Sequence, residues 1–387
     1  MIPPVNDMAL HEKYMQLALD EARKGLGRTA PNPAVGAVVV RDNVILGCGY
    51  HKKAGTAHAE VNALANVRGN GHDPRGARMY VTLEPCNHTG RTPPCTEAIL
   101  VAGIEEVFIG VKDPNGQVQG GGAQYLSGKG VEVTLGVCES ACQQLILPFV
   151  KHSHSDLPWV LLKAGLSLDG KIAYRKGQGG AITGPEASVF VHQLRNEMDA
   201  ILIGVGTAAA DNPSLTTRLA GGSSRDPLRV VLDTRLRLSP ESKMLQQNSS
   251  AETWIFCHEN ASNEKAKELQ KKGAKVFRVP KQANDGKEGE RLDIKNILAT
   301  LGQYNLTSLL VEGGSAIHGA FLRAGLVDEW CLIYAPFFIG EEGIPLLQGQ
   351  HAAQRFEEGL LHNVRTSFLG DDILVQAYAR SLSDYFP

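Results

Sequence analysis

The sequence has almost no net charge and therefore lacks a feature common to many nucleic-acid-binding proteins. It contains 39 Lys or Arg against 41 Asp or Glu among 387 residues, a formal net charge of −2. The balance is the same in both parts of the chain, with 14 basic and 15 acidic residues in residues 1–156 and 25 and 26 in the remainder. Neither part is a basic domain of the kind that binds nucleic acid or an anionic membrane.

Segments for membrane insertion or export are also lacking. No stretch of about 18 apolar residues occurs, and the first residues have no basic segment followed by an apolar run. The seven cysteines are odd in number and scattered, which makes a poor disulfide framework. We therefore expect a cytoplasmic protein whose thiols are reduced or bind metal.

What the sequence does have is a regular alternation of apolar strands and helical patterns, typical of an α/β fold. A chain with 43% hydrophobic residues can bury a sizeable core, and at this length we expect two domains. A first helix is expected from Asn6 or Asp7 to Gly25. The first part should then form strands at 34–40, 44–49, 79–83, 107–111 and 131–135, with helices at about 58–67, 94–102 and 123–127.

The second part continues the same pattern after a polar segment that ends in proline. That segment, residues 151–158, is predicted to be a linker between domains at 1–150 and 157–380. Strands are expected at 159–164, 200–204, 228–233, 253–257, 275–279, 308–312, 330–335 and 373–379, with helices at about 186–198, 263–272 and 317–324. Residues 281–290 are predicted to be a solvated surface loop.

A His-x-Glu pair and two Pro-Cys pairs point to a catalytic zinc site. His58, Cys86 and Cys95 supply three ligands and leave a fourth position open for water. Glu60 stays off the metal and can carry a proton between the water and a leaving nitrogen. This H-x-E, P-C and C pattern is the signature of zinc nucleobase deaminases. Eight residues separate the two cysteines where the usual spacing is two, so the intervening loop is expected to line a substrate pocket.

An alternative is a structural zinc site, or core Cys and His residues that bind no metal. A structural site normally has a fourth protein ligand, for which His51 and His88 are nearby candidates. Glu60 would then have no function. The other five cysteines are expected to be small core residues: Cys48, Cys138, Cys142, Cys257 and Cys331.

Two segments of the second part are candidates for binding a dinucleotide. Residues 204–209 match G-x-G-x-x-A after a strand, with Asp226 at a distance suited to a ribose hydroxyl. The helix that should follow is cut short by Pro213, which argues against a Rossmann unit. Gly313 and Gly314 lie between a strand and a helix, where exposed backbone N–H groups suit a pyrophosphate. A simple tight turn remains the alternative there.

Residues 30–36, 51–60 and 82–95 closely resemble the deaminase domain of bifunctional riboflavin-biosynthesis deaminase/reductases. The resemblance implies a cytidine-deaminase-like three-layer domain that removes the pyrimidine 2-amino group of 2,5-diamino-6-ribosylamino-4(3H)-pyrimidinone 5′-phosphate. Residues 112–115 would close this site. The residues that the resemblance places around the substrate are Asn32, His51, Glu84, Asn87 and His88.

Residues 163–173, 182–184, 204–216 and 311–314 look like the reductase domain of the same family. The resemblance implies a dihydrofolate-reductase-like fold in which NADPH reduces the ribosyl group to ribityl, with Asp211 and Lys163 as candidates for proton delivery or positioning. The implied cofactor contacts are Gly165, Ala181, Thr207, Asp211, Thr234, Gly314, Ser315, Ala316, Ile317, His318, Gly319 and Ala320. The implied substrate contacts are Gly179, Arg195, Leu215, Arg218 and Glu312.

The sequence thus predicts a cytoplasmic, homo-oligomeric enzyme of riboflavin synthesis that uses Zn²⁺ and NADPH on a small phosphorylated pyrimidine. Two hypotheses of other classes compete with it. An RNA deaminase with an appended binding domain would need a basic, aromatic surface on one domain, which the even charge balance disfavours. A non-catalytic zinc scaffold would leave Glu60 without a function.

Overall fold

The computed structural model describes residues 5–88, 93–114, 121–221, 224–280, 291–349 and 361–386. The chain divides into two compact units, one ending at His154 and the other running from Ser155 to Tyr385. Each unit is an α/β structure, as the alternating pattern predicts. The loop predicted at 281–290 and the last residue of the segment predicted at 112–115 lie outside the described residues.

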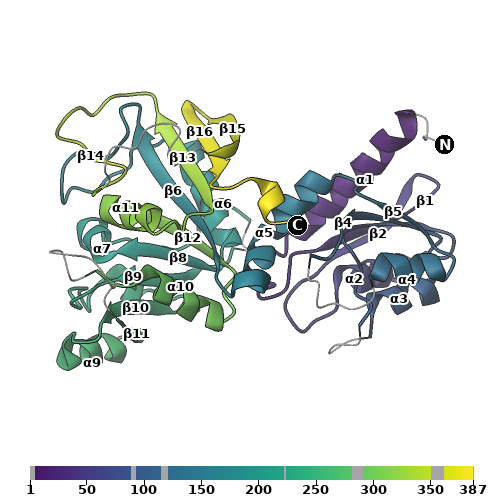
Figure 1. The fold of residues 1–387 in the computed structure, drawn as a ribbon, viewed down its shortest axis with the longest axis horizontal. Helices are drawn as coiled ribbons and strands as arrows, with labels where there is room; N and C mark the ends of the chain where they lie inside the picture. The colour runs from purple at the N-terminus through teal and green to yellow at the C-terminus, as the bar shows by residue number, and fades with distance from the viewer. Residues whose placement is uncertain are drawn as a thin grey trace. The chain divides into compact units, whose positions relative to one another are not determined.

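In its described residues the first unit consists of one five-stranded sheet and five helices (Figure 1). The strands are β1 (Gly36–Arg41), β2 (Val44–Tyr50), β3 (Arg78–Leu83), β4 (Glu106–Val111) and β5 (Glu132–Leu135). The helices are α1 (Val5–Arg23), α2 (Ala59–Gly69), α3 (Cys95–Ala102), α4 (Gly122–Gly128) and α5 (Glu139–Ser155). The strand order is β2-β1-β3-β4-β5, with β3, β4 and β5 parallel.

Alternation along the strands explains the layers of this unit. Val81 and Ile109 face a core formed with α2, α3 and α4. Tyr80 and Phe108 project to the other face of the sheet, where the His11 ring of α1 stacks on Phe108 with 4.1 Å between ring centres. The pleat of the strands therefore separates two helical layers across one sheet.

Helix α5 corrects the predicted linker. Residues 151–155 continue this helix, which contains Pro148 and buries Cys142 and Ile146. The polar end of the helix resembles a linker in composition, but its apolar residues secure the preceding turns in the core. The connection to the next strand is confined to the residues after Ser155.

The second unit is built on a nine-stranded sheet, ordered β11-β10-β9-β8-β12-β6-β13-β16-β15 in the described residues (Figure 1). Its strands are β6 (Trp159–Ser167), β8 (Ala200–Gly204), β9 (Leu228–Leu232), β10 (Thr253–His258), β11 (Ala274–Val279), β12 (Ser308–Gly313), β13 (Glu329–Ala335), β15 (His362–Leu369) and β16 (Asp372–Tyr378). β7 (Lys171–Ala173) and β14 (Ile344–Pro345) form a separate pair.

The helices of this unit follow the strands along the chain. They are α6 (Pro185–Glu197), α7 (Val205–Asp211), α8 (Lys243–Gln246), α9 (Asn263–Lys271), α10 (Ile294–Gln303), α11 (Ser315–Arg323) and the 3-10 helix η1 (Leu382–Asp384). β9, β8, β12, β6 and β13 are mutually parallel neighbours, whereas β16 and β15 are antiparallel additions. Parallel strands bring their carboxyl ends to one edge of the sheet, where ligand sites of open α/β folds lie.

Within the described residues, no helix is long and apolar enough to cross a lipid bilayer. All seven cysteines lie in described segments and are free thiols in the structure.

Candidate functional sites

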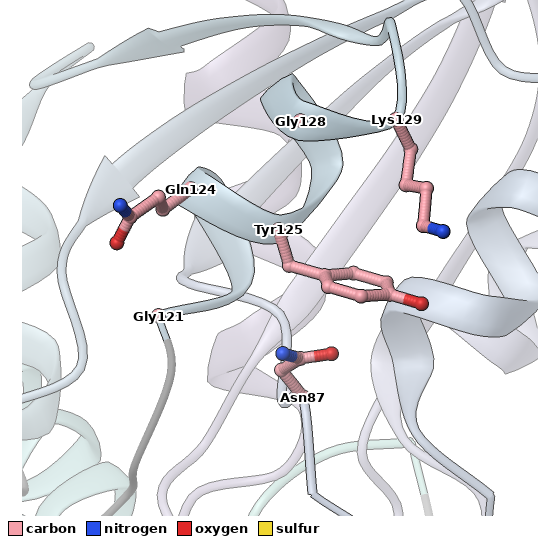
Figure 2. A pocket seen from close by; sticks show the side chains of 6 residues that line it. All are labelled: Asn87, Gly121, Gln124, Tyr125, Gly128 and Lys129. Atoms are coloured by element: carbon pink, nitrogen blue, oxygen red, sulfur yellow. The ribbon is translucent and has the colours of Figure 1, made fainter.

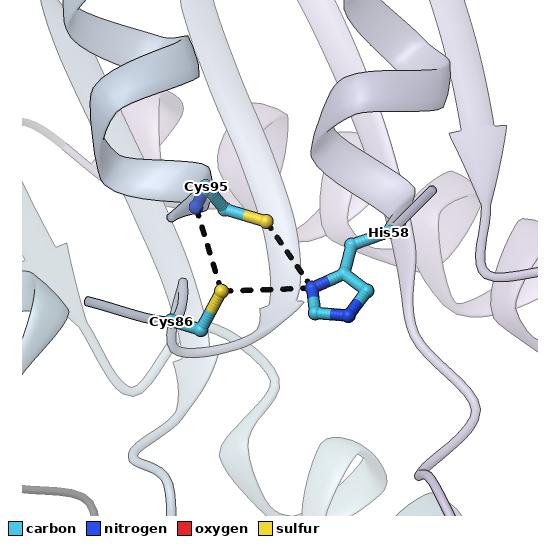
Figure 3. Close-up of side chains that lie close together, drawn as sticks. All are labelled: His58, Cys86 and Cys95. Atoms are coloured by element: carbon cyan, nitrogen blue, oxygen red, sulfur yellow. Dashed lines mark hydrogen bonds between the residues drawn. The ribbon is translucent and has the colours of Figure 1, made fainter. Parts of the chain in front are cut away.

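The first site forms where two helices begin beside the end of a strand. His58 is the N-cap residue of α2, and Cys95 is the first residue of α3. Cys86 follows β3 by three residues. Cys86 Sγ and Cys95 Sγ lie 3.6 Å and 3.3 Å from His58 Nδ1 (Figure 3). Three donors from distant parts of the chain therefore converge on one point, as the spacing predicts.

These distances fit a zinc ion. Tetrahedral zinc at its usual distances from sulfur and imidazole nitrogen holds those two atoms about 3.5 Å apart. The three ligand atoms all lie within 4.8 Å of one another. The hydrogen bond between the two thiols lowers the pKa of Cys86 to about 4, which favours the thiolate that a metal binds, and raises the pKa of Cys95.

Glu60 lies in the first turn of α2 with 3% of its surface exposed. Burial raises the pKa of this carboxyl to about 7. Its carboxyl also interacts with the Cys95 thiol, which places it beside the ligand cluster. A carboxyl that is close to the metal site and exchanges protons near neutral pH suits a proton shuttle.

His51 does not complete a four-ligand site. Its Nδ1 lies 3.1 Å from the Ala57 carbonyl, and its Nε2 lies 3.2 Å from the Asn32 amide. His88 is exposed and, like His51, is absent from the ligand cluster found among the described residues. The structure thus favours three ligands with an open position over a closed structural site.

Glu84 has a supporting role that the sequence did not indicate. Its two carboxylate oxygens accept hydrogen bonds from the backbone N–H groups of Asp113 at 3.1 Å and Ala123 at 2.9 Å. It therefore joins the segment after β4 to the first turn of α4. Asn87 is similarly supported, since its Oδ1 accepts a hydrogen bond from Thr96 Oγ1 at 2.9 Å.

A hollow of about 360 Å³ lies beside Asn87 and is shown in Figure 2. Tyr125 points into this region and donates a hydrogen bond to Glu97 at 2.5 Å. The lining residues are Asn87, Gly121, Gln124, Tyr125, Gly128 and Lys129. Only Asn87 was expected near a ligand, and the hollow includes none of the zinc-cluster residues.

The second site lies at the carboxyl ends of β8 and β12. Gly313 and Gly314 have φ values of +85° and +58°, which only glycine adopts without strain. Thr207 of α7 donates a hydrogen bond to the Gly313 carbonyl at 3.3 Å. The two candidate dinucleotide segments, which are about 100 residues apart in the sequence, are therefore neighbours in space.

Asp226 does not serve the first of these segments in the manner of a Rossmann fold. Its carboxylate accepts hydrogen bonds from Thr217 N and Ser249 Oγ, both at 2.7 Å. Helix α7 has only seven residues. The interpretation of residues 204–209 and Asp226 as a Rossmann fingerprint is therefore wrong, although Thr207 does lie at the site.

Several side chains of the range Gly314–Ala320 pack into the protein. His318 is 1% exposed and lies beneath Gly313, where a Cβ on residue 313 would overlap its imidazole ring. Ile317 packs against Gly204, and Gly319 approaches the Gln348 carbonyl closely. The buried His318 side chain is therefore not placed to line a phosphate site, and the expectation that the backbone of this range surrounds phosphates stays a prediction.

Arg195 and Glu312 contact each other. Arg195 Nε and Nη2 donate to the two carboxylate oxygens of Glu312, each at 2.7 Å, and both side chains are less than 15% exposed. Burial alone would raise the pKa of Glu312, but the charge and hydrogen bonds of Arg195, together with the charges of Lys163 and His192, lower it below its usual value. Arg195 is therefore not a solvated surface residue of α6, and its charge is already balanced inside the protein.

The structure also explains why residue 179 is glycine. A Cβ at this position would overlap Asp211 Oδ1, so a residue with a side chain would not fit beside the present Asp211 rotamer. Lys163 lies on β6, close enough to Glu312 to lower the pKa of its carboxyl. Gly165 is on the same strand, and Thr234 follows β9, so the predicted residues share the edge formed by the parallel strands.

Comparison with known proteins identifies the families that the two parts of the chain match. Residues 8–111 match the cytidine and deoxycytidylate deaminase zinc-binding region, and residues 158–375 match the RibD C-terminal domain. The chain is 40% identical to riboflavin biosynthesis protein RibD of Bacillus amyloliquefaciens, over 97% of this chain and 98% of that protein. It is 38% identical to RibD of Aquifex aeolicus, over 95% and 98%.

The chain belongs to the RibD family.

Solved structures of RibD proteins agree with this assignment. The Thermotoga maritima diaminohydroxyphosphoribosylaminopyrimidine deaminase/5-amino-6-(5-phosphoribosylamino)uracil reductase superposes with a TM-score of 0.82 at 34% identity, covering 97% of this chain and 100% of that one. Acinetobacter baumannii RibD gives a TM-score of 0.80 at 32% identity, with the same coverage. The predicted fold class is confirmed: a cytidine-deaminase-like domain precedes the RibD reductase domain.

Membership of the RibD family establishes a bifunctional deaminase/reductase of riboflavin biosynthesis. The zinc-binding deaminase region implies Zn²⁺, and the reductase domain implies a nicotinamide cofactor. The hypothesis of an RNA deaminase with an appended binding domain is not supported, because the second unit matches a RibD reductase domain over nearly its whole length. A non-catalytic zinc scaffold is likewise disfavoured.

Proposed function

We propose that residues 1–150 deaminate 2,5-diamino-6-ribosylamino-4(3H)-pyrimidinone 5′-phosphate and that residues 157–380 then reduce its ribosyl group to ribityl with NADPH. The observation that carries the deaminase assignment is the convergence of His58, Cys86 and Cys95 beside the buried Glu60. The name of the solved T. maritima relative, a deaminase and reductase of this class of phosphoribosylaminopyrimidine, supports the choice of substrate.

In the deamination, the chain's own groups bind the metal and move a proton. His58, Cys86 and Cys95 would hold Zn²⁺, which when bound would activate water for attack near neutral pH. Glu60 accepts a proton from the attacking water and donates it to the leaving amino group. The pyrimidine carbon gains a C–O bond and loses its C–N bond, and ammonia leaves. His51, held neutral by burial, and Asn32 form the adjoining wall of the site.

In the reduction, a bound nicotinamide cofactor would supply hydride to C1′ of the opened sugar. The turn at Gly313 and Gly314 offers backbone N–H groups to the cofactor's phosphates. Lys163 or Asp211 delivers the accompanying proton; partial burial raises the pKa of Asp211, which favours its protonated form. The preference for NADPH over NADH follows from the family resemblance.

The order of the two reactions is tested by supplying the diaminopyrimidine substrate with and without NADPH. Ammonia should appear without NADPH, and NADPH should be oxidised only after ammonia release. Stripping the metal should abolish ammonia release, and restoring zinc should recover it. NADPH oxidation by a Glu60→Gln variant given the undeaminated substrate would contradict the proposed order.

We also propose that the protein acts in the cytoplasm, as a homo-oligomer, on small molecules and not on nucleic acid. Seven free thiols support a reducing compartment. The near-neutral charge of both halves opposes electrostatic binding of RNA. Sedimentation of the purified protein would give the subunit number, and filter binding that found salt-sensitive RNA affinity would contradict the choice of partner.

A further inference from the structure

The segment Leu215–Arg218 carries two of the expected substrate residues and is held in a conformation that it would not adopt alone. Leu215 has a φ of +54°, in the left-handed region that a branched side chain rarely occupies. Its side chain is 3% exposed. Contacts with the rest of the unit must therefore maintain this backbone.

Three hydrogen bonds hold the segment at three successive residues. Arg195 Nη1 donates to the Thr216 carbonyl at 3.3 Å, and Thr217 N donates to Asp226 Oδ1 at 2.7 Å. Arg218 N donates to His192 Nδ1 at 3.2 Å. Two of the three partners, His192 and Arg195, come from α6 and are separated by one helical turn.

The two arginines near this segment differ in their availability to a ligand. Arg195 is committed to Glu312 through two hydrogen bonds and is largely buried. Arg218 is exposed, and its guanidinium has no hydrogen-bond or ion-pair partner within the described residues. Arg218 is therefore the cation that remains free to pair with a phosphomonoester.

His192 acts as an acceptor only while its Nδ1 carries no proton. The side chain is 7% exposed. Burial lowers its pKa, and the charges of Arg195 on the same helix and Arg218 on the segment lower it further, against the opposing charge of Glu312 on β12. These groups keep the imidazole neutral, with its hydrogen on Nε2, at physiological pH.

We propose that His192 is a positioning residue of the reductase site: by accepting the Arg218 amide it fixes the segment so that the Arg218 guanidinium meets the phosphate of the pyrimidine substrate. Arg195, one turn further along α6, supports the same segment while paired with Glu312. The proposal rests on the proposed function, because it assumes that the reductase substrate carries a phosphate.

The test compares His192→Leu, which removes the acceptor at similar volume, with His192→Gln, whose side-chain oxygen can still accept. In His192→Leu the KM for the deaminated pyrimidine should rise by roughly tenfold, as expected for the loss of one partly buried hydrogen bond that orients a charge. The reductase kcat and the KM for NADPH should stay near the wild-type values. His192→Gln should recover most of the loss.

A double-mutant cycle separates positioning from a general effect on the fold. If His192 acts through Arg218, His192→Leu should add almost nothing in an Arg218→Ala background. Ammonia release by the zinc site of the same molecules serves as an internal control of concentration and should not change.

Three outcomes would overturn the inference: an unchanged pyrimidine KM in His192→Leu, additive effects in the cycle, or a parallel rise in the KM for NADPH, which would make His192 a support of the fold. Failure of the proposed function looks different, because the wild-type protein itself would then not oxidise NADPH with the deaminated pyrimidine.

Discussion

The two sites differ in how much of the chain is needed to build them. The zinc site takes its ligands from the starts of two helices and from the residues after one strand, and its chemistry resides in three side chains and one carboxyl. The reductase site is spread over β6, α6, α7, β12 and the segment after α7, and much of it is backbone. The zinc site therefore depends mainly on the identity of a few side chains. The reductase site depends mainly on the sheet, which aligns strands, helices and loops from distant parts of the sequence.

The largest expected effect is at the zinc site. Glu60→Gln should lower ammonia release by roughly a thousandfold, because general acid–base groups typically contribute factors of 10²–10⁴. Reduction of the already deaminated pyrimidine should be unchanged, and metal analysis should still find one zinc per chain. A parallel loss of reductase activity would break the comparison, since it would show that the two sites are not independent.

Arg195→Met should produce the next largest effect, on stability. It leaves Glu312 buried without its partner, and removing one member of a buried pair typically costs about 3–5 kcal/mol. We expect the denaturant midpoint of the second unit to fall, with the first unit's transition unmoved. The matched control is Arg23→Met, which removes an exposed ion pair on α1 and should change stability little. Equal losses of stability in the two variants would contradict the view that the buried Arg195–Glu312 pair stabilises the second unit.

Gly313→Ala should lower reductase kcat/KM by about a hundredfold, since alanine would combine a strained positive φ with a clash against His318. The control is Gly206→Ala, where a Cβ has open space and no positive φ is required. We expect Gly206→Ala to retain its affinity for the nicotinamide cofactor, measured by fluorescence titration. A strong loss of affinity for the nicotinamide cofactor in Gly206→Ala would instead indicate that residues 204–209 form the phosphate-binding turn.

A smaller effect should appear in the pH dependence of the stability of the second unit. Burial raises the pKa of Glu329 to about 7, with Trp159 Nε1 donating to its carboxyl at 3.1 Å. The folded state therefore binds a proton more tightly than the unfolded state, so stability falls as pH rises from about 4.5 to 7. Glu329→Gln should stabilise the second unit by roughly 3 kcal/mol at pH 8 and by little at pH 4. Thermal unfolding at both pH values tests this, and a gain that is independent of pH would contradict it.

The same contrast explains what could be predicted from the sequence. Most strands and the zinc ligands were found, because apolar periodicity and metal-ligand spacing are local patterns. The pairing of Arg195 with Glu312 could not be predicted in this way, because it joins residues 117 positions apart. Each was expected to touch substrate, and nothing in the local sequence shows that they neutralise each other.

Elements were missed for equally physical reasons. β15 is exposed along almost its whole length, so it lacks the alternation of buried and exposed side chains, and pairing with β16 makes it a strand. The end of α5 has a polar composition that suggested a linker. α10 was missed although it has an Asp293 cap and a buried apolar face, a signal that the sequence does contain. The sequence also contains a signal for His192, because this residue lies one helical turn before Arg195 on the same helix.

The central position of β12 in the sheet affects the order in which parts of the second unit unfold. This strand lies between β8 and β6, and Leu309, Leu310 and Val311 are fully buried. Its backbone amides should be among the slowest in the unit to exchange with deuterium. The glycine turn that follows it, although exposed enough to meet a ligand, is attached directly to the part of the sheet that unfolds last. Local fluctuations at the outer strands β15 and β11 can therefore occur while the ligand-binding turn keeps its geometry.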